Sequence, residues 1–260
     1  MTDNAARPLA VVTGASSGIG LELARVLAAH DHDLVVCAED AAIHEVAASL
    51  PGTARAVQVD LATWEGNEEL LARTDLDTRP VAVAVINAGV GAAGRFVDTD
   101  LEDDLRLVQL NVGSTVHLGK AFARQMAAGG EGRLLFTSSV ASQMPGPGYA
   151  TYAASKSFVQ SFAHAIRVEL ADSGVSVTSL LPGPTDTDFF ARAGMRGTRV
   201  DEGHKDDPRK VAEDAYEALM AGKAEVVAGS LLNSVQTVAA QVLPDAVKAR
   251  LHGMLTRRSA

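Results

Sequence analysis

The stretch Leu9-Ala-Val-Val-Thr-Gly-Ala-Ser-Ser-Gly-Ile-Gly20 joins an apolar strand to a helix through a glycine-rich turn. Its first four residues are apolar throughout, as strands covered on both faces of a parallel sheet are. Beyond Gly20 the apolar residues recur at helical spacing. A glycine turn between a strand and a helix is the setting of a phosphate-binding loop, because the free N–H groups at the helix N-terminus attract an anion.

This turn therefore predicts a nucleotide site. Gly14 permits the tight turn, Gly18 lets the backbone approach a pyrophosphate, and Gly20 brings the helix close onto the strand. The spacing is G-x-x-x-G-x-G rather than the commoner G-x-G-x-x-G. The loop residues expected to contact the nucleotide are Gly14, Ser16, Ser17, Gly18, Ile19 and Gly20.

Short apolar runs recur along the chain and end in small or polar residues, which suits a ligand lying across the carboxyl ends of a parallel sheet. After the first strand, the runs predict strands at residues 34–38, 56–59, 81–86, 133–136, 175–180 and 225–227. Helical patterns between them cover residues 65–73, 98–128, 151–171 and 208–221. The chain is thus predicted to be an α/β protein.

Length and composition limit the function classes. A chain of 260 residues suits one α/β domain over residues 1–260. The net charge of −9 argues against nucleic acid as a partner. Neither a signal peptide nor a run of roughly 20 apolar residues occurs, so we expect a cytoplasmic protein without an integral membrane segment. Cys37 is the only cysteine and the histidines are scattered, so we expect no disulfide and no metal site.

Two carboxylates, Glu39 and Asp40, follow the second predicted strand, about 20 residues beyond the glycine loop. An acidic residue there accepts hydrogen bonds from ribose hydroxyls in dinucleotide-binding folds. Alternatively, these are carboxylates at the N-terminus of the next helix, where they interact favourably with its dipole. Each interpretation could hold for one of the two residues.

Tyr152-Ala-Ala-Ser-Lys156 places a phenol and an ammonium one helical turn apart. A tyrosine hydroxyl titrates near pH 10, and a neighbouring ammonium lowers that pKa by favouring the phenolate. The pair could therefore be an acid/base centre, but the pentapeptide alone favours an amphipathic helix with a packed tyrosine and a solvated lysine, so the rest of the chain has to decide. Asn111 lies within the long helical region beside Gly113 and Ser114, which suggests a local distortion; an exposed polar residue is the alternative.

Two segments have no clear place in the sheet. Residues 186–207 are rich in glycine and charge without a helical period, and we interpret them as a mobile lid around a short helix. Residues 230–260 form a C-terminal extension of one or two amphipathic helices interrupted at Pro244. A packing arm is the preferred role of this extension, ahead of a partner or membrane-surface contact.

The ordered set of motifs resembles the short-chain dehydrogenase/reductase family, in its single-domain form of about 250 residues. The resemblance spans Leu9 to Phe189, about seventy per cent of the chain, and Ser139 lies thirteen residues before the tyrosine. The matching marks are Thr13-Gly-x-x-x-Gly-x-Gly20, Asp60-Leu61, Asn87-Ala-Gly89, Asn111, Ser139, Tyr152-x-x-x-Lys156 and Pro182-Gly183 with Thr187.

The resemblance implies a Rossmann-type, doubly wound sheet of seven parallel strands with helices on both faces. It also implies hydride transfer between a nicotinamide cofactor and a carbonyl or secondary alcohol. Tyr152 would be the acid/base, Lys156 would lower its pKa and hold the nicotinamide ribose, Ser139 would polarise the substrate oxygen, and Asn111 would connect Lys156 to solvent through a water. The other implied cofactor contacts are Asp60, Leu61, Asn87, Ala88, Gly89, Pro182, Gly183, Thr185 and Thr187.

Two alternatives remain at this point: a non-catalytic nucleotide-binding regulator of the same fold, and a sugar-nucleotide epimerase or dehydratase. The first usually lacks one of the catalytic residues, and the second carries a larger C-terminal substrate domain. The substrate-facing loops are largely apolar or glycyl, which suggests a medium-sized, mostly apolar ketone or secondary alcohol.

The residues around the predicted ribose site also bear on the choice between NAD(H) and NADP(H). No basic residue occupies the glycine loop or follows the second strand, and Glu39 would repel a 2′-phosphate, so NAD(H) is favoured and NADP(H) is the alternative. The family's acidic position could instead align with Ala38.

Relatives pair the two long helices across a twofold axis, and apolar residues such as Phe122, Met126, Phe158 and Val159 suggest a homodimer or homotetramer.

Overall fold

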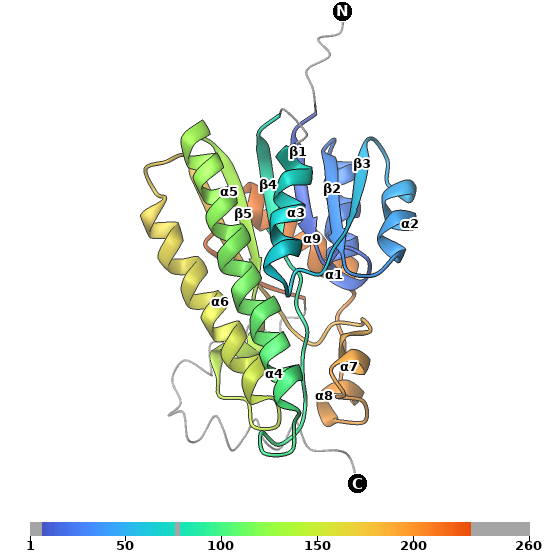
Figure 1. The fold of residues 1–260 in the computed structure, drawn as a ribbon. Coiled ribbons are helices and arrows are strands. Elements are labelled where there is room, and N and C mark those ends of the chain that lie inside the picture. The colour runs from blue at the N-terminus through green and yellow to red at the C-terminus, as the bar shows by residue number, and fades with distance from the viewer. Residues whose placement is uncertain (1–6, 76–78, 230–260) are drawn as a thin grey trace, which may run out of the picture.

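The computed structural model describes residues 7–75 and 79–229 of the chain. Their centre is a seven-stranded parallel sheet in the order β3-β2-β1-β4-β5-β6-β7 (Figure 1). The strand order reverses between β1 and β4, which places a crevice at the carboxyl ends of these two strands. The strands are β1 (Leu9–Thr13), β2 (Asp33–Ala38), β3 (Ala54–Gln58), β4 (Val81–Ile86), β5 (Gly132–Thr137), β6 (Val175–Pro182) and β7 (Glu225–Ala228).

Helices cover both faces of this sheet, so the strands are buried and the fold has three layers. One face packs against α1 (Gly18–Ala29), α2 (Ala42–Ser49) and α9 (Pro208–Met220). The other packs against α3 (Trp64–Asp75), α5 (Thr115–Gly129) and α6 (Ala150–Glu169). The predicted doubly wound fold is confirmed, with strand ends shifted by one or two residues.

The long helical region predicted over residues 98–128 is interrupted in its middle. It consists of α4 (Leu101–Val108), a π-helical segment over Gln109–Ser114 and α5. Figure 1 shows the pieces as one continuous but bent helix. Segments of π-helix inside α-helices are rare and occur frequently at functional sites, and this one contains Asn111.

The predicted lid contains two short helices, α7 (Phe189–Arg192) and α8 (Arg199–Glu202). Phe190, Ala193 and Met195 are buried in an apolar cluster with Tyr149 and Ala153. The segment is therefore packed against the start of α6. The predicted C-terminal extension at residues 230–260 lies outside the described residues.

One argument for assembly was wrong. Phe122, Met126 and Val159 are buried in the chain's own core, so they offer no face to a partner. These three residues of α5 and α6 pack against the sheet, and periodicity alone does not separate a core face from an interface. Phe158, in contrast, is 38% exposed.

In the part of the chain that the structure describes, no helix is long and apolar enough to cross a membrane.

Candidate active site

The candidate site lies at the carboxyl ends of β1, β4 and β5, which Asn87 connects. Its backbone N–H donates to Thr13 Oγ1 at 2.9 Å, and its side-chain amide donates to the carbonyl oxygen of Thr13 at 3.1 Å. Its Oδ1 accepts a hydrogen bond of 3.1 Å from Thr137 Oγ1. Asn87 thus holds three strand ends together, and its side chain is engaged with protein groups.

The glycine loop fits a dinucleotide. Gly14 has a φ of +65°, and a Cβ there would come within 2.8 Å of Ala88 Cα, so a side chain is excluded on both grounds. Ser17 is the N-cap residue of α1 and is extended, yet its side chain makes no capping hydrogen bond, and the first turn holds no acidic residue. These N–H groups suit a pyrophosphate, which their dipole attracts.

The other cofactor-facing residues predicted from the sequence border this loop. A Cβ on Gly18 would lie 3.0 Å from Thr187 Cγ2, so Thr187 sits against the loop. Thr185 is buried and donates to the carbonyl oxygen of Gly183 at 2.9 Å, which shapes the turn after Pro182. Ile19 packs against the core on one face of the sheet, and Leu61 is buried in the core on the other face.

The structure brings Ser139, Tyr152 and Lys156 together. Ser139 follows β5 and forms a side-chain hydrogen bond with Tyr152. Lys156 is 5% exposed, and its Nζ donates to the carbonyl oxygen of Thr137 at 2.9 Å. The same Nζ lies 5.8 Å from the centroid of the Tyr152 ring. The phenol of Tyr152, the hydroxyl of Ser139 and the amine of Lys156 thus lie close together at the end of β5.

The expected lowering of the tyrosine pKa is not found in this structure. Burial raises the pKa of Tyr152 to about 12, and the hydrogen bond with Ser139 opposes this only in part. Burial also lowers the pKa of Lys156 to about 8. In both groups desolvation is the largest effect, and it disfavours the charged form.

Asn111 is buried rather than exposed, and the π-helical segment directs it toward the same site. Its Oδ1 accepts from the N–H of Val90 at 2.9 Å, while its Nδ2 donates to the Val90 carbonyl at 2.9 Å and to Ser155 Oγ at 3.0 Å. A Cβ on Gly89 would lie 3.1 Å from Asn111 Oδ1 and 3.2 Å from Lys156 Nζ. Asn111 and Lys156 therefore flank Gly89, where a side chain would crowd both of them.

The two carboxylates after β2 have different partners. Asp40 accepts from Ser16 Oγ at 2.7 Å and from the N–H of Ala42 at 3.2 Å, so it joins the glycine loop to the start of α2. Glu39 instead pairs with Arg106 Nη2 at 2.7 Å. Asp40 therefore lies at the N-terminus of α2, as one of the two alternatives expected, and Glu39 lies in an ion pair with α4.

Arg106, on α4, is the residue that the sequence did not point to. Its Nη1 pairs with Asp60 Oδ2 at 2.8 Å, so one guanidinium bridges the carboxylates that follow β2 and β3. Burial alone would raise the pKa of Asp60, but hydrogen bonds from Arg106 and the Ala62 N–H lower it below its ordinary value. The glycine loop and the residues directly after β2 carry no basic residue, as the sequence shows, and the cation beside Glu39 comes instead from α4.

The side chains next to the Tyr152 ring are aromatic and apolar. The Phe189 ring centroid lies 5.3 Å from that of Tyr152, and the Tyr149 centroid lies 6.1 Å from it. Phe189 and Ala93 also pack against the cluster that contains Ala141 and Met195. The start of the predicted lid thus forms one side of the space beside the phenol.

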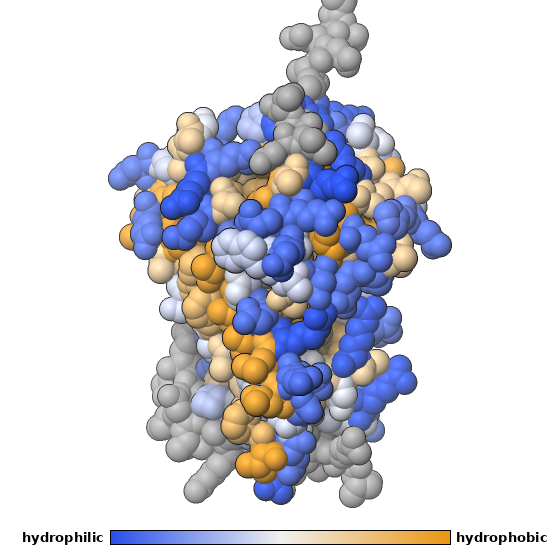
Figure 2. All heavy atoms as spheres, viewed as in Figure 1, coloured by the Kyte–Doolittle hydropathy of each residue, from blue (hydrophilic) through white to orange (hydrophobic). Residues whose placement is uncertain are grey.

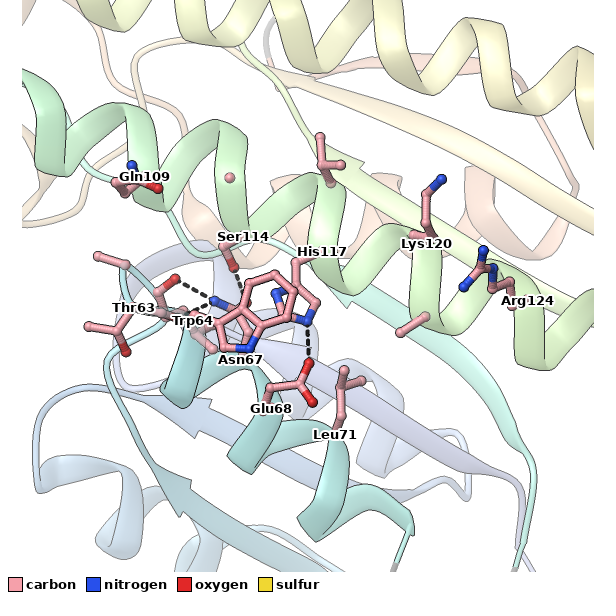
Figure 3. Close-up of a pocket in the computed structure, with 15 residues that line it drawn as sticks. Thr63, Trp64, Asn67, Glu68, Leu71, Gln109, Ser114, His117, Lys120 and Arg124 are labelled. Carbon is pink, nitrogen blue, oxygen red and sulfur yellow. Dashed lines mark hydrogen bonds and ion pairs between the residues drawn. The ribbon is translucent and has the colours of Figure 1, made fainter.

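A separate hollow of about 560 Å³ lies between α3 and α5 (Figure 3). Its wall contains Trp64, and two side-chain pairs cross it: Ser114 with Asn67 at 2.8 Å and His117 with Glu68 at 2.6 Å. Of the predicted site residues, only Leu61 lines it. The hollow is therefore distinct from the candidate active site.

Comparisons with known proteins agree on the family. Residues 8–196 match the family model described as short chain dehydrogenase. The probable oxidoreductase EphD of Mycobacterium tuberculosis is 31% identical over 233 residues, which are 88% of this chain and 39% of that protein. The chain thus spans less than half the length of this relative.

Two further relatives match over more of their length. The 3-oxoacyl-acyl-carrier-protein reductase of Synechocystis is 36% identical over 188 residues, which are 70% of this chain and 75% of that protein. A solved short-chain dehydrogenase from Sphingobium yanoikuyae in complex with NADPH is 27% identical, with a TM-score of 0.80 and coverage of 92% of this chain and 97% of that one. Since the matched region runs from the glycine loop past Lys156, this protein belongs to the short-chain dehydrogenase family.

Proposed function

We propose that this protein is an NAD(P)-dependent oxidoreductase that interconverts a ketone and a secondary alcohol. The observation that carries the proposal is the grouping of Ser139, Tyr152 and Lys156 at the end of β5, beside a glycine loop that fits a dinucleotide. The nicotinamide cofactor supplies or accepts the hydride when bound. The names of relatives support the same class, since they are oxidoreductases and reductases.

The chain's own residues then divide the work at the substrate oxygen. Tyr152 donates its phenolic proton to that oxygen during reduction, and the raised pKa keeps the phenol protonated at neutral pH. Ser139 donates a hydrogen bond to the same oxygen as negative charge develops. Lys156 places a cation one turn away and holds ribose hydroxyls, while Asn111 relays protons between Lys156 and solvent.

A non-catalytic regulator and a sugar-nucleotide epimerase are less well supported. A regulator has no need for the buried Lys156, whose charged form burial disfavours, and perturbed groups of this kind cluster at catalytic sites. For the epimerase, the relatives offer less support, since they are named as oxidoreductases and reductases. Turnover separates the first alternative from an enzyme, and product analysis separates the second.

The proposed cofactor preference is for NAD(H). Glu39 can accept hydrogen bonds from both ribose hydroxyls, whereas a 2′-phosphate with up to about two negative charges meets Glu39, Asp40 and Asp60. The NADPH in the Sphingobium structure keeps NADP(H) as the alternative. The ratio of kcat/KM for the two cofactors measures the preference.

The proposed substrate is a medium-sized, mostly apolar ketone or secondary alcohol. The aromatic rings of Tyr149 and Phe189 flank Tyr152, and the buried Met195 and Ala141 belong to the same cluster. Such a wall favours apolar groups beside the carbonyl carbon. A panel of ketones and alcohols, assayed with both cofactors by NAD(P)H absorbance, tests the reaction class; no turnover with any member would contradict it.

The proposed assembly is a homodimer or homotetramer. Leu101, Leu105 and Val108 recur on one side of α4 and are 68%, 54% and 39% exposed. A band of hydrophobic residues follows α4 and α5 on the surface in Figure 2. An exposed apolar stripe of this kind favours burial against a second copy, and Phe158 on α6 adds to the apolar surface.

A further inference from the structure

Arg106 reaches the adenosine end of the crevice from a distant part of the chain. It lies on α4, whereas its two partners directly follow β2 and β3. Both contacts are charge-assisted and short, at 2.7 Å to Glu39 and 2.8 Å to Asp60. Glu39 and Asp60 are also two of the carboxylates that a 2′-phosphate would meet under the proposed function.

The guanidinium is accessible rather than sealed in the core. The side chains of Arg106, Glu39 and Asp60 are 46%, 58% and 34% exposed. Exposed pairs of this kind contribute little to folding stability, about 1 kcal/mol or less. A contact between a guanidinium and the carboxylates of two separate strand ends therefore matters more for the local charge than for the fold.

The charged side chains around Arg106 indicate its effect on the local net charge. Three carboxylates gather there, and Asp40 is engaged by Ser16 and the Ala42 N–H, which are both neutral. Arg106 is the cation that pairs with the other two, Glu39 and Asp60. With Arg106 the four side chains carry a net charge of about −2, and without it about −3.

We propose that Arg106 is a cofactor-selecting residue, whose guanidinium weakens the repulsion between the carboxylates and a 2′-phosphate and so permits NADP(H) to bind alongside the favoured NAD(H). The inference rests on the proposed nicotinamide cofactor. Guanidinium groups pair readily with phosphate as well as carboxylate, so Arg106 can contact the phosphate while remaining beside Asp60. The uncharged ribose hydroxyls of NAD(H) gain much less binding free energy from the guanidinium.

The test is a comparison of the dissociation constants of NADH and NADPH, measured by calorimetry without substrate. In Arg106→Gln, the ratio of the NADPH constant to the NADH constant should rise about tenfold, equivalent to about 1.4 kcal/mol. Arg106→Lys keeps the charge and should leave the ratio near that of the wild type. Arg209→Gln, which removes an exposed guanidinium paired with Glu213 on α9, is the matched control and should not change it.

The salt dependence provides a second readout. Because these side chains are partly exposed, raising the ionic strength toward 1 M, where the Debye length is about 3 Å, should reduce the difference between wild type and Arg106→Gln. An unchanged ratio in Arg106→Gln, or equal weakening of both cofactors, would overturn the role of Arg106 while leaving the proposed function intact. Failure of the wild type to bind either cofactor would overturn both.

Discussion

The Nζ of Lys156 lies 5.8 Å from the centroid of the Tyr152 ring and donates its hydrogen bond to the carbonyl oxygen of Thr137 rather than to the phenol. Lys156 is thus tied to the end of β5, and Tyr152 to Ser139. Both ionisable groups are buried, so each resists its charged form. The site keeps a proton on the phenol and holds an ammonium nearby at a cost in stability.

The first prediction concerns this cost. Burial lowers the pKa of Lys156 from 10.5 to about 8, so between these values the unfolded chain binds the proton that the folded chain lacks. The Lys156 contribution to stability therefore rises with pH from about 8 to 10.5 and is least favourable at pH 7. Lys156→Met removes this pH-dependent contribution. The free energy of unfolding of the variant minus that of wild type should therefore be higher at pH 7 than at pH 10, by on the order of 2–3 kcal/mol. Urea unfolding of both proteins at the two pH values measures this, and an equal difference at both would contradict the buried ammonium.

The second prediction separates binding from chemistry at the same residue. Lys156→Ala should lower kcat and also weaken NADH binding, because one side chain is proposed to serve both the ribose and the proton balance. Lys120→Ala, an exposed lysine on α5 in the hollow of Figure 3, is the control and should change neither. Steady-state kinetics and NADH fluorescence titration give the two readouts. Full binding with lost turnover would remove the ribose role.

The third prediction concerns Glu39. Glu39→Arg replaces the acceptor of the ribose hydroxyls by a cation and should shift the kcat/KM ratio toward NADPH by roughly a hundredfold, or about 3 kcal/mol. Glu45→Arg makes the same charge change at an exposed position on α2 and should have a much smaller effect. If wild type already prefers NADPH, the assignment of Glu39 is wrong.

The fourth prediction concerns assembly. Leu105, which is 54% exposed on α4, should be covered by a second copy, so Leu105→Asp should lower the mass measured by light scattering toward that of a monomer. Met220→Asp alters an apolar residue on α9, which covers the opposite face of the sheet, and should keep the wild-type mass. A monomeric wild type at micromolar concentration would count against the proposed dimer or tetramer.

The sequence predicted the sheet well because buried parallel strands are continuous apolar runs with clear ends. It also located the glycine loop and the Tyr152–Lys156 pair, since local spacing defines both. Asn111 was suspected of distorting its helix because asparagine and glycine are poor helix formers, and the π-helical segment is the distortion.

Other features depend on contacts between distant segments. Arg106 is 46 residues from Asp60 and 67 from Glu39, and no local pattern connects them. The pKa of Tyr152 depends on how many atoms surround it, which spacing does not specify. Phe122 and Met126 illustrate the same limit, because an apolar helix residue serves a core or an interface equally well in sequence.

The central claim, that Tyr152 exchanges a proton with the substrate oxygen, is tested most directly by Tyr152→Phe. This variant keeps the ring against Phe189 and removes only the hydroxyl. Tyr216→Phe, on α9 near His30, serves as the matched control. With a ketone found in the substrate panel, Tyr152→Phe should lower kcat by at least about a hundredfold while NADH binding and folding stay near wild type. Turnover by Tyr152→Phe at the wild-type rate would contradict the account.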